Sequence, residues 1–488
     1  MNIYQKRPIF RRREEVSIYR MFLWVVLILA GIWLIRSVQL GDVKPLFLPT
    51  ATPTRFALSY ASEGDALFTA GKLEDSKSED GTVISPGAIS AFREAAEVDP
   101  NNVQVWADLS RIQTYSTALL VNQDEILARL DEAIASAEKA VEVNPDNSYA
   151  HAVYAFSLNW KASYISDDRD RQALLTKSEQ EAVRALQLDN TNALALAFYA
   201  EVLVDQQKWT QAQQYIDQAL ELDSSLMDVH RVHAYVLESL GEYALAIESY
   251  NRAIAITPNL TFLYLRAGAG YRRLAFESPN EDIQRQLYET SLEYFAQTAR
   301  INEQLGVRDP VPYLSIARTY SQMGEFFIAI RNVQKTLEFQ PDNPVFYGEL
   351  GVLYHKNRNY ETGILALKCA VRGCTAEESC DGRGGCGSND VPAAVEGLPL
   401  SASTVYYYDV YASELAALST PKKNYCEEAL AIANIISASE YIADPNIAAD
   451  GVVVRNICAG VNAGVTGADV PTATSETEVM DVTPTAVP

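Results

Sequence analysis

Apolar and small side chains recur along most of the chain at intervals of three and four residues, with polar residues between them. In the stretch LGEYALAIESYNRAIAITPN (240–259), Ala246, Tyr250 and Ala253 follow one another at these intervals, and Pro258 comes near the end. Residues three and four apart share one face of an α-helix, and proline cannot continue a helix. The pattern therefore predicts an amphipathic helix that ends before Pro258.

The same order of small, large and helix-breaking positions returns at a fixed period. The unit that starts at Ala193 is followed directly by a unit that starts at Met227, 34 residues later. In the second unit the eighth and twentieth positions are small, the twenty-fourth is large and the thirty-second is proline. Each unit predicts two antiparallel helices. Because one pair cannot bury its apolar stripe alone, consecutive pairs must stack.

The segment YGELGVLY (347–354) resembles the tetratricopeptide repeat, whose pattern is W-x2-L-G-x2-Y…A-x3-F…P. The resemblance implies an all-α fold, a right-handed α-solenoid of helix-turn-helix repeats. It places eight repeats over 57–376, and a degenerate ninth repeat with a capping helix over 403–462. The eight repeats are 57–102, 103–147, 148–192, 193–226, 227–260, 261–309, 310–343 and 344–376.

Four of these repeats, which start at 57, 103, 148 and 261, exceed the regular length by about 11 to 15 residues. The additional residues fall between the two helices of each repeat. We expect them to lengthen both helices by about a turn in the repeats at 103 and 148. In the first repeat we expect a loose loop over 71–87.

The N-terminal region contains an apolar run, MFLWVVLILAGIWLI (21–35), without a charged residue. About 20 helical residues cross a hydrocarbon layer of ~30 Å, and basic residues favour the cytoplasmic side. Six basic residues lie within 1–20. We therefore predict a transmembrane helix over 21–40, which crosses the cell membrane once. Residues 1–20 would lie in the cytoplasm and the solenoid on the extracytoplasmic side. A cleaved signal peptide is the alternative. A Pro/Thr linker (41–56) and a disordered Pro/Thr tail (463–488) flank the folded part.

Charge and motifs exclude several classes of function. The formal net charge is −23, although the first 20 residues are basic, so we expect no nucleic-acid partner. The sequence contains no G-x-S-x-G, H-E-x-x-H, phosphate-binding or dinucleotide-binding motif. His230 and His233 could form a metal pair, but their repeat positions favour packing. We predict no enzyme activity, no cofactor and no metal.

All six cysteines lie in the last quarter of the chain, which favours disulfides in an exported protein. We predict a bond between Cys426, in the ninth repeat, and Cys458, in the capping helix. The other four lie around the Cys/Gly-rich loop at 377–402, and two bonds among them leave three connectivities open. They are Cys369, Cys374, Cys380 and Cys386. A four-thiolate zinc site is the alternative, with spacings wider than usual. The acidic residues of the loop do not have the spacing of an EF-hand, so we do not expect them to bind calcium.

The resemblance also implies a binding groove, because the first helix of each tetratricopeptide repeat lines the concave face. Positions 2, 5, 9, 12 and 13 of that helix tend to point inward. Carried over to this chain, they give candidate partner-binding residues that are aromatic early and basic late. They are Tyr149, Phe156, Trp160, Arg231, Tyr235, Phe262, Arg272, Arg273, Arg318, His355 and Lys356, with Arg111 in the second repeat. Such a groove suits an extended peptide with acidic groups. The alternative is that these are ordinary solvated helix residues.

Three hypotheses of function follow from these features. The first is a membrane-anchored scaffold that binds another protein or an extended peptide on the extracytoplasmic side. The second is a structural protein of the cell surface or wall, in which the solenoid is a self-assembling spacer. The third is an accessory subunit of an envelope enzyme or a secretion complex. Oligomeric state is left open.

Overall fold

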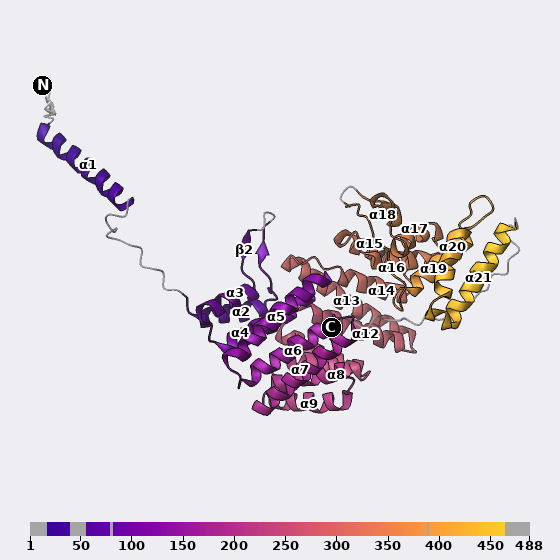
Figure 1. The fold of residues 1–488 in the computed structure, drawn as a ribbon, viewed down its shortest axis with the longest axis horizontal. Coiled ribbons are helices and arrows are strands. Elements are labelled where there is room, and N and C mark those ends of the chain that lie inside the picture. Colours follow the sequence, from indigo (N-terminus) through magenta and orange to yellow (C-terminus); the bar gives the residue numbers. More distant parts are fainter. Residues whose placement is uncertain (1–16, 40–54, 79–81, 388–389, 464–488) are drawn as a thin grey trace, which may run out of the picture. The chain divides into compact units, whose positions relative to one another are not determined.

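The computed structural model describes residues 17–39, 55–78, 82–387 and 390–463, and it forms two compact units divided after Phe56 (Figure 1). The first unit contains α1 (Ile18–Gln39), and its described large apolar side chains, up to Trp33, are exposed. No helix in the described part of the chain is both long enough and apolar enough to span a membrane. Most of the predicted tail, of the linker and of the basic segment lies outside the described residues.

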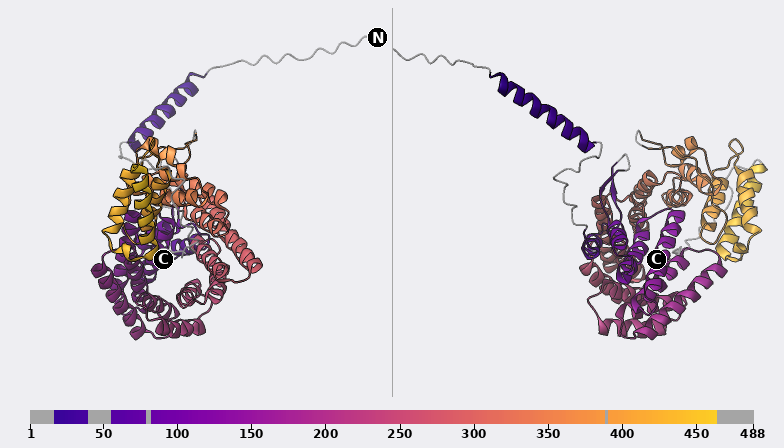
Figure 2. Two further views of the ribbon diagram at one scale, coloured as in Figure 1. Left: turned by 90° about the vertical axis from the view of Figure 1, so that its right-hand side faces the viewer. Right: turned by 60° about the vertical axis from the view of Figure 1, so that its left-hand side comes forward.

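The described part of the second unit begins with eight consecutive pairs of contacting helices, which follow one another in chain order (Figure 2). The pairs are α2 (Ala57–Thr69) with α3 (Ala88–Val98), α4 (Val103–Ser116) with α5 (Gln123–Val143), α6 (Ser148–Ser163) with α7 (Asp168–Leu188), α8 (Ala193–Asp205) with α9 (Trp209–Leu222), α10 (Met227–Ser239) with α11 (Tyr243–Ile256), α12 (Thr261–Glu277) with α13 (Glu281–Leu305), α14 (Val311–Gln322) with α15 (Phe326–Phe339), and α16 (Pro344–Lys356) with α17 (Tyr360–Val371). Their first helices also touch in succession, α4 with α6, α6 with α8, and α8 with α10. The described chain is therefore an all-α stack, as predicted.

The C-terminal part of this unit contains four more α-helices among the described residues. They are α18 (Ala376–Gly382), α19 (Val405–Leu418), α20 (Cys426–Ser437) and α21 (Pro445–Asn462). Short 3-10 helices, η1 (Thr117–Leu119) and η2 (Glu440–Ala443), follow α4 and precede α21. Because α21 packs against both α19 and α20, it occupies the place expected of the capping helix.

The small eighth position of a repeat provides space for a large side chain from the second helix. A Cβ atom on Gly64 would lie 2.4 Å from the Phe92 ring, and one on Gly351 would lie 2.4 Å from Leu367 Cγ. Both partners are fully buried. The repeat pattern therefore encodes contact between the two helices of a pair at van der Waals distance.

Two details of the inserted segments differ from the expectation. The segment 71–87 contains a two-stranded antiparallel hairpin, β1 (Ser76–Lys77) with β2 (Val83–Ser85), where we expected a loose loop. In the repeat at 103 the second helix, α5, has 21 residues, but α4 has only 14, close to the 13 of α8. Lengthening both helices is thus wrong for this repeat. In the repeat at 148 both helices are longer, as expected, with 16 residues in α6 and 21 in α7 against 13 in α8 and 14 in α9.

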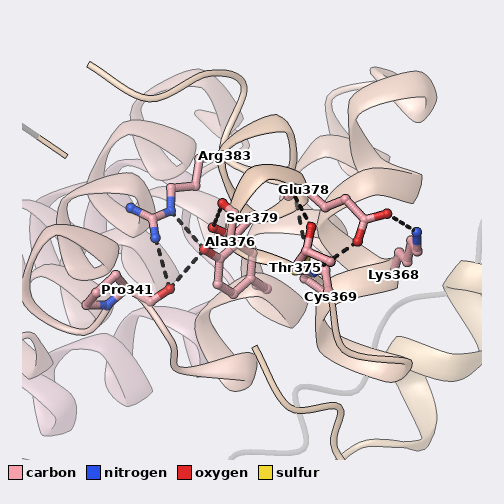
Figure 3. The surroundings of a disulfide bond; sticks show 10 residues. Pro341, Lys368, Cys369, Thr375, Ala376, Glu378, Ser379 and Arg383 are labelled. Atoms are coloured by element: carbon pink, nitrogen blue, oxygen red, sulfur yellow. Dashed lines mark hydrogen bonds and ion pairs between the residues drawn. A yellow bond between two sulfur atoms is a disulfide. The ribbon is translucent and has the colours of Figure 1, made fainter. Parts of the chain in front are cut away.

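Three disulfides stabilise the C-terminal end. Cys426–Cys458 joins α20 to α21, which is the bond predicted. The connectivity left open by the sequence is Cys369–Cys374, which precedes α18 (Figure 3), and Cys380–Cys386, which joins a residue within α18 to the segment after it. The segment predicted as a Cys/Gly-rich loop, 377–402, is not only a loop, because α18 begins at Ala376 after a capping box at Thr375 and continues into it as far as Gly382.

Candidate binding site on the first helices of the repeats

A polar cavity of about 370 Å³ is lined only by the first helices of five successive pairs and their N-terminal caps. We call it the acidic pocket. Its lining residues are Asp65, Gln104, Asp108, Arg111, Tyr149, Asn192, Leu194, Leu226 and Asp228. The volume lies in the range of about 300–1,000 Å³ that is typical of ligand sites.

The repeat periodicity builds this pocket. Gln104, Tyr149, Leu194 and Asp228 all occupy the second position of their repeats, so stacking brings equivalent positions together. The helix starts are fixed by local capping. Asn192 accepts hydrogen bonds from the backbone N–H groups at the start of α8, and its Nδ2 donates to a side chain of the preceding repeat (3.0 Å). The pocket is therefore a property of the array, since no single repeat forms it.

The charges in the pocket do not balance. Arg111 Nη1 donates to Asp228 Oδ2 at 2.7 Å, so the one guanidinium of the pocket is already paired. Asp108 accepts only from neutral donors, the hydroxyl of Tyr149 (2.6 Å) and the amide of Gln104 (3.1 Å). The carboxyl group of Asp65 has no hydrogen-bond or ion-pair partner among the described residues, although its backbone carbonyl accepts a hydrogen bond from Thr69 Oγ1 at 3.0 Å. Two carboxyl groups thus lack a contacting cation.

Burial acts on these two carboxyl groups in the same direction. It raises the pKa of Asp108 above its ordinary value, against the opposing effect of Arg111. It also raises the pKa of Asp65, and the nearby charge of Asp108 raises it further. A bound cation would relieve both effects, because it favours the charged form of each carboxyl group. The site is thus suited chemically to an ammonium or guanidinium group.

Beneath the pocket, Arg231 forms a buried network across the stack. Its guanidinium donates to both carboxylate oxygens of Glu201 (2.7 and 2.6 Å) and, through Nε, to the hydroxyl of Tyr115 (2.9 Å). Tyr115 donates in turn to Asp228, and Trp160 Nε1 donates to Glu201 at 3.0 Å. These bonds connect α4, α6, α8 and α10. They close contacts between segments more than 110 residues apart in the chain.

Three predicted groove residues are therefore part of the core. Phe156, Trp160 and Arg231 are each 5% exposed or less, and the ring of Phe156 stacks on Phe198 with centroids 4.5 Å apart. The structure contradicts an open binding surface at these three positions, because a ligand cannot reach them without separating the helices. Phe262 is half-buried and stacks on Tyr115 at 5.6 Å, which extends the same aromatic cluster to α12.

The other predicted residues also have partners within the chain. Tyr149 and Tyr235 donate to Asp108 and Asp205, each at 2.6 Å. The basic side chains contact acceptors on the same or a neighbouring helix. These contacts are Arg272 with the Ser315 carbonyl (3.3 Å), Arg273 with Glu277 (2.7 Å), Arg318 with Glu349 (2.6 Å), His355 with Glu414 (3.2 Å) and Lys356 with Ser321 (3.3 Å). The structure brings only Tyr149 and Arg111 of the whole set into the pocket.

The histidine pair is accounted for by hydrogen bonds. His230 Nε2 lies 2.8 Å from the Ser224 carbonyl, and His233 Nδ1 lies 2.8 Å from Ser249 Oγ. The described residues hold no group of three or more histidine, cysteine or acidic side chains arranged for a metal ion.

Sequence reasoning missed the acidic members of the site. Asp65 and Glu201 occupy the ninth position of their repeats and Asp228 the second, which are inward positions. The signal was present, but aromatic and basic residues drew attention because they are exceptional in an acidic chain. Asp108, at a sixth position, gave no such signal, because only the close approach of neighbouring first helices turns it towards the pocket.

The comparisons with known proteins agree with this architecture. Sequence models described as Tetratricopeptide repeat match residues 200–261 and 125–147. Human mitochondrial import receptor subunit TOM70 is 23% identical over 179 residues, which is 36% of this chain and 27% of TOM70. Human antiviral innate immune response effector IFIT1 is 25% identical over 217 residues, which is 43% of this chain and 45% of IFIT1. The matched segments thus span less than half of the length of these curated relatives.

Among solved structures, a monomeric IFIT1 variant with Gppp-AAAA is similar to this chain with a TM-score of 0.51. The match has 15% sequence identity and covers 85% of this chain and 91% of that one. At this identity the likeness concerns the fold. The matched models show tetratricopeptide repeats at residues 125–147 and 200–261, and the eight stacked helix pairs of the described residues share the all-α fold of that solved structure.

Proposed function

We propose that this protein is a scaffold that binds a segment of another protein in the acidic pocket and catalyses no reaction itself. The observation that carries the proposal is a cavity formed jointly by five successive first helices, in which Asp65 and Asp108 have no cationic partner. A lysine or arginine side chain of the partner would supply the missing charge. This replaces the acidic peptide expected from the sequence.

A nucleic-acid ligand is not favoured, although IFIT1 has been solved with Gppp-AAAA. Three of the four charged residues that line the pocket are acidic, and the fourth, Arg111, is already paired with Asp228. Phosphate groups would meet carboxylates in a partly desolvated space, where like-charge repulsion is strong. A protein ligand is supported instead, and TOM70 is by name an import receptor subunit.

Membrane anchorage through the N-terminal apolar run, with the solenoid outside the cytoplasm, belongs to the same proposal. Its support is the charge asymmetry of 1–20 and the exposed apolar side chains of α1. Extraction of the native chain with carbonate or with detergent tests it. Release by carbonate alone would count against an anchor. Self-assembly of the purified chain without a ligand would favour the spacer hypothesis over the scaffold.

Peptide binding tests the pocket directly. We would measure binding of fluorescent peptides of one length that differ only in a central lysine, norleucine or glutamate. Desolvated hydrogen bonds to a charged group contribute about 1.5–3 kcal/mol, so lysine should bind at least about tenfold more tightly than norleucine. The variant Asp65→Asn/Asp108→Asn should lose this preference.

The matched control is Asp168→Asn, because Asp168 is a highly exposed carboxylate on α7, outside the pocket. It should bind the lysine peptide as the unmodified chain does. Equal affinity for the lysine and norleucine peptides would refute the cationic ligand. A preference for lysine that survives in the Asp65→Asn/Asp108→Asn variant would place the binding elsewhere.

A further inference from the structure

We propose that Cys380–Cys386 is a thiol–disulfide exchange site for an external dithiol, and that its reduction releases a buried arginine from the α15–α16 junction. The bond encloses a loop of five residues at the C-terminal end of α18. Arg383 lies inside this loop and is only 4% exposed. The inference does not depend on the ligand of the acidic pocket.

Arg383 is held without a counter-charge. Its Nη2 donates to the Pro341 carbonyl at 2.9 Å (Figure 3). Its Nε also donates to the Tyr347 hydroxyl (2.8 Å), and Nη2 to the Val391 carbonyl (3.3 Å). Within the described part of the chain no carboxylate lies at ion-pair distance from this guanidinium. A buried charge that contacts only neutral acceptors is held at a cost, because water solvates it better.

The backbone of the loop also contacts α15 and α16. The carbonyl of Arg383 accepts from Gln334 Nε2 on α15 at 2.7 Å and from the Tyr354 hydroxyl on α16 at 3.3 Å. Gly384 and Gly385 follow with φ of +85° and +110°, which side-chain-bearing residues rarely adopt. The short disulfide-closed loop restricts the open conformations, so it offsets the cost of burying the guanidinium.

The opposite end of α18 is fixed independently. Thr375 and Glu378 form the capping box, Glu378 also contacts Lys368 at 2.6 Å, and Cys369–Cys374 joins the same segment to α17 (Figure 3). Loss of Cys380–Cys386 would therefore free the C-terminal end of α18 and Arg383, while the N-terminal end stays in place.

The three disulfides differ in accessibility. Cys380 and Cys386 are both partly exposed, whereas Cys426 and Cys458 are 1% and 0% exposed. In the third disulfide Cys374 is partly exposed but its partner Cys369 is 0% exposed, so Cys380–Cys386 is the one of the three in which both cysteines are accessible. Exchange requires a thiolate to reach a disulfide sulfur, so access determines which bond reacts first.

One thiolate of a dithiol would attack a sulfur of Cys380–Cys386 and form a mixed disulfide, with the other cysteine leaving as a thiolate. The second thiol of the reagent would then displace the remaining cysteine. Two electrons and two protons pass to the protein, and the reagent leaves as a cyclic disulfide.

The test uses the full chain and dithiothreitol as the probe. Samples taken during reduction are alkylated and mapped by mass spectrometry, and parallel samples are treated with phenylglyoxal, which modifies accessible arginines. We expect Cys380 and Cys386 to be alkylated at least about tenfold faster than Cys426 and Cys458. Arg383 should become reactive with phenylglyoxal at the rate at which Cys380 and Cys386 become alkylated. Arg252, whose side chain is 58% exposed, should react before and after reduction.

Two variants separate release from general loosening. In Cys380→Ser/Cys386→Ser, Arg383 should be reactive without any reductant, with unchanged helical circular dichroism. In Cys369→Ala/Cys374→Ala, which lacks the neighbouring bond, Arg383 should stay protected. If the first variant does not fold, the time course of the unmodified chain decides. Continued protection of Arg383 after Cys380–Cys386 is reduced would overturn the proposal, and so would earlier alkylation of Cys426 and Cys458.

Discussion

The buried Arg231–Glu201 pair allows a quantitative test of how the stack is held together. We consider Arg231→Ala. The substitution removes two short ionic hydrogen bonds to Glu201 and one hydrogen bond to Tyr115. Glu201 is 3% exposed and would keep only the indole N–H of Trp160 as a donor. Removing one partner of a buried pair leaves an uncompensated charge, which costs about 3–5 kcal/mol.

The exposed pair Arg273–Glu277 provides the matched comparison. It has a similar shortest distance, 2.7 Å against 2.6 Å, but each of its side chains is 44% exposed. Exposed pairs one helical turn apart contribute about 0.3–0.5 kcal/mol, so Arg273→Ala should cost less than about 1 kcal/mol. The double variant Glu201→Leu/Arg231→Leu removes both buried charges, and should be more stable than Arg231→Ala.

Urea unfolding followed by circular dichroism measures these differences. Repeat arrays can unfold in segments, so hydrogen exchange should accompany the urea titration. With Arg231→Ala we expect faster exchange in α4 as well as in α8 and α10, because the lost contacts join these helices. An equal loss of stability in Arg231→Ala and Arg273→Ala would refute the reasoning.

Two further predictions concern the C-terminal end and the packing of a repeat. Burial, and then the neighbouring carboxyl groups of Asp450 and Asp444, raise the pKa of Asp409 from 3.8 to about 8. A pKa raised on folding gives stability that is complete below the unfolded value and is lost as the pH rises through the folded value. Unfolding of the C-terminal helices should therefore become easier between about pH 4 and pH 8, by at least about 1 kcal/mol, and Asp409→Asn should flatten this dependence in urea titrations across that range. A Cβ on Gly351 would lie 2.4 Å from Leu367 Cγ, so Gly351→Ala should cost about 1–3 kcal/mol. Adding Leu367→Ala should not add its full separate cost, and strict additivity would contradict this contact.

The local architecture could be predicted from the sequence because it depends on neighbours within one repeat. Small residues such as Gly351 and large ones such as Leu367 recur at fixed spacing, and that spacing determines which faces of two consecutive helices meet. The bond between Cys426 and Cys458 followed from the same register, because both cysteines belong to adjacent helices at the end of the array.

The site could not be predicted in this way, because it depends on contacts between distant repeats. Each repeat is rotated slightly from the previous one, and these rotations add up along the array. Their sum brings Arg111 to Asp228 and Tyr115 to Arg231, across separations of 117 and 116 residues. The sequence by itself determined the helix pairs and the faces on which the two helices of a pair meet. Only the tertiary structure decided which side chains of the first helices are buried against one another and which line a pocket. The physical reason is that the curvature of the array is the sum of the rotations at many interfaces between repeats, and a pattern within one repeat does not contain that sum.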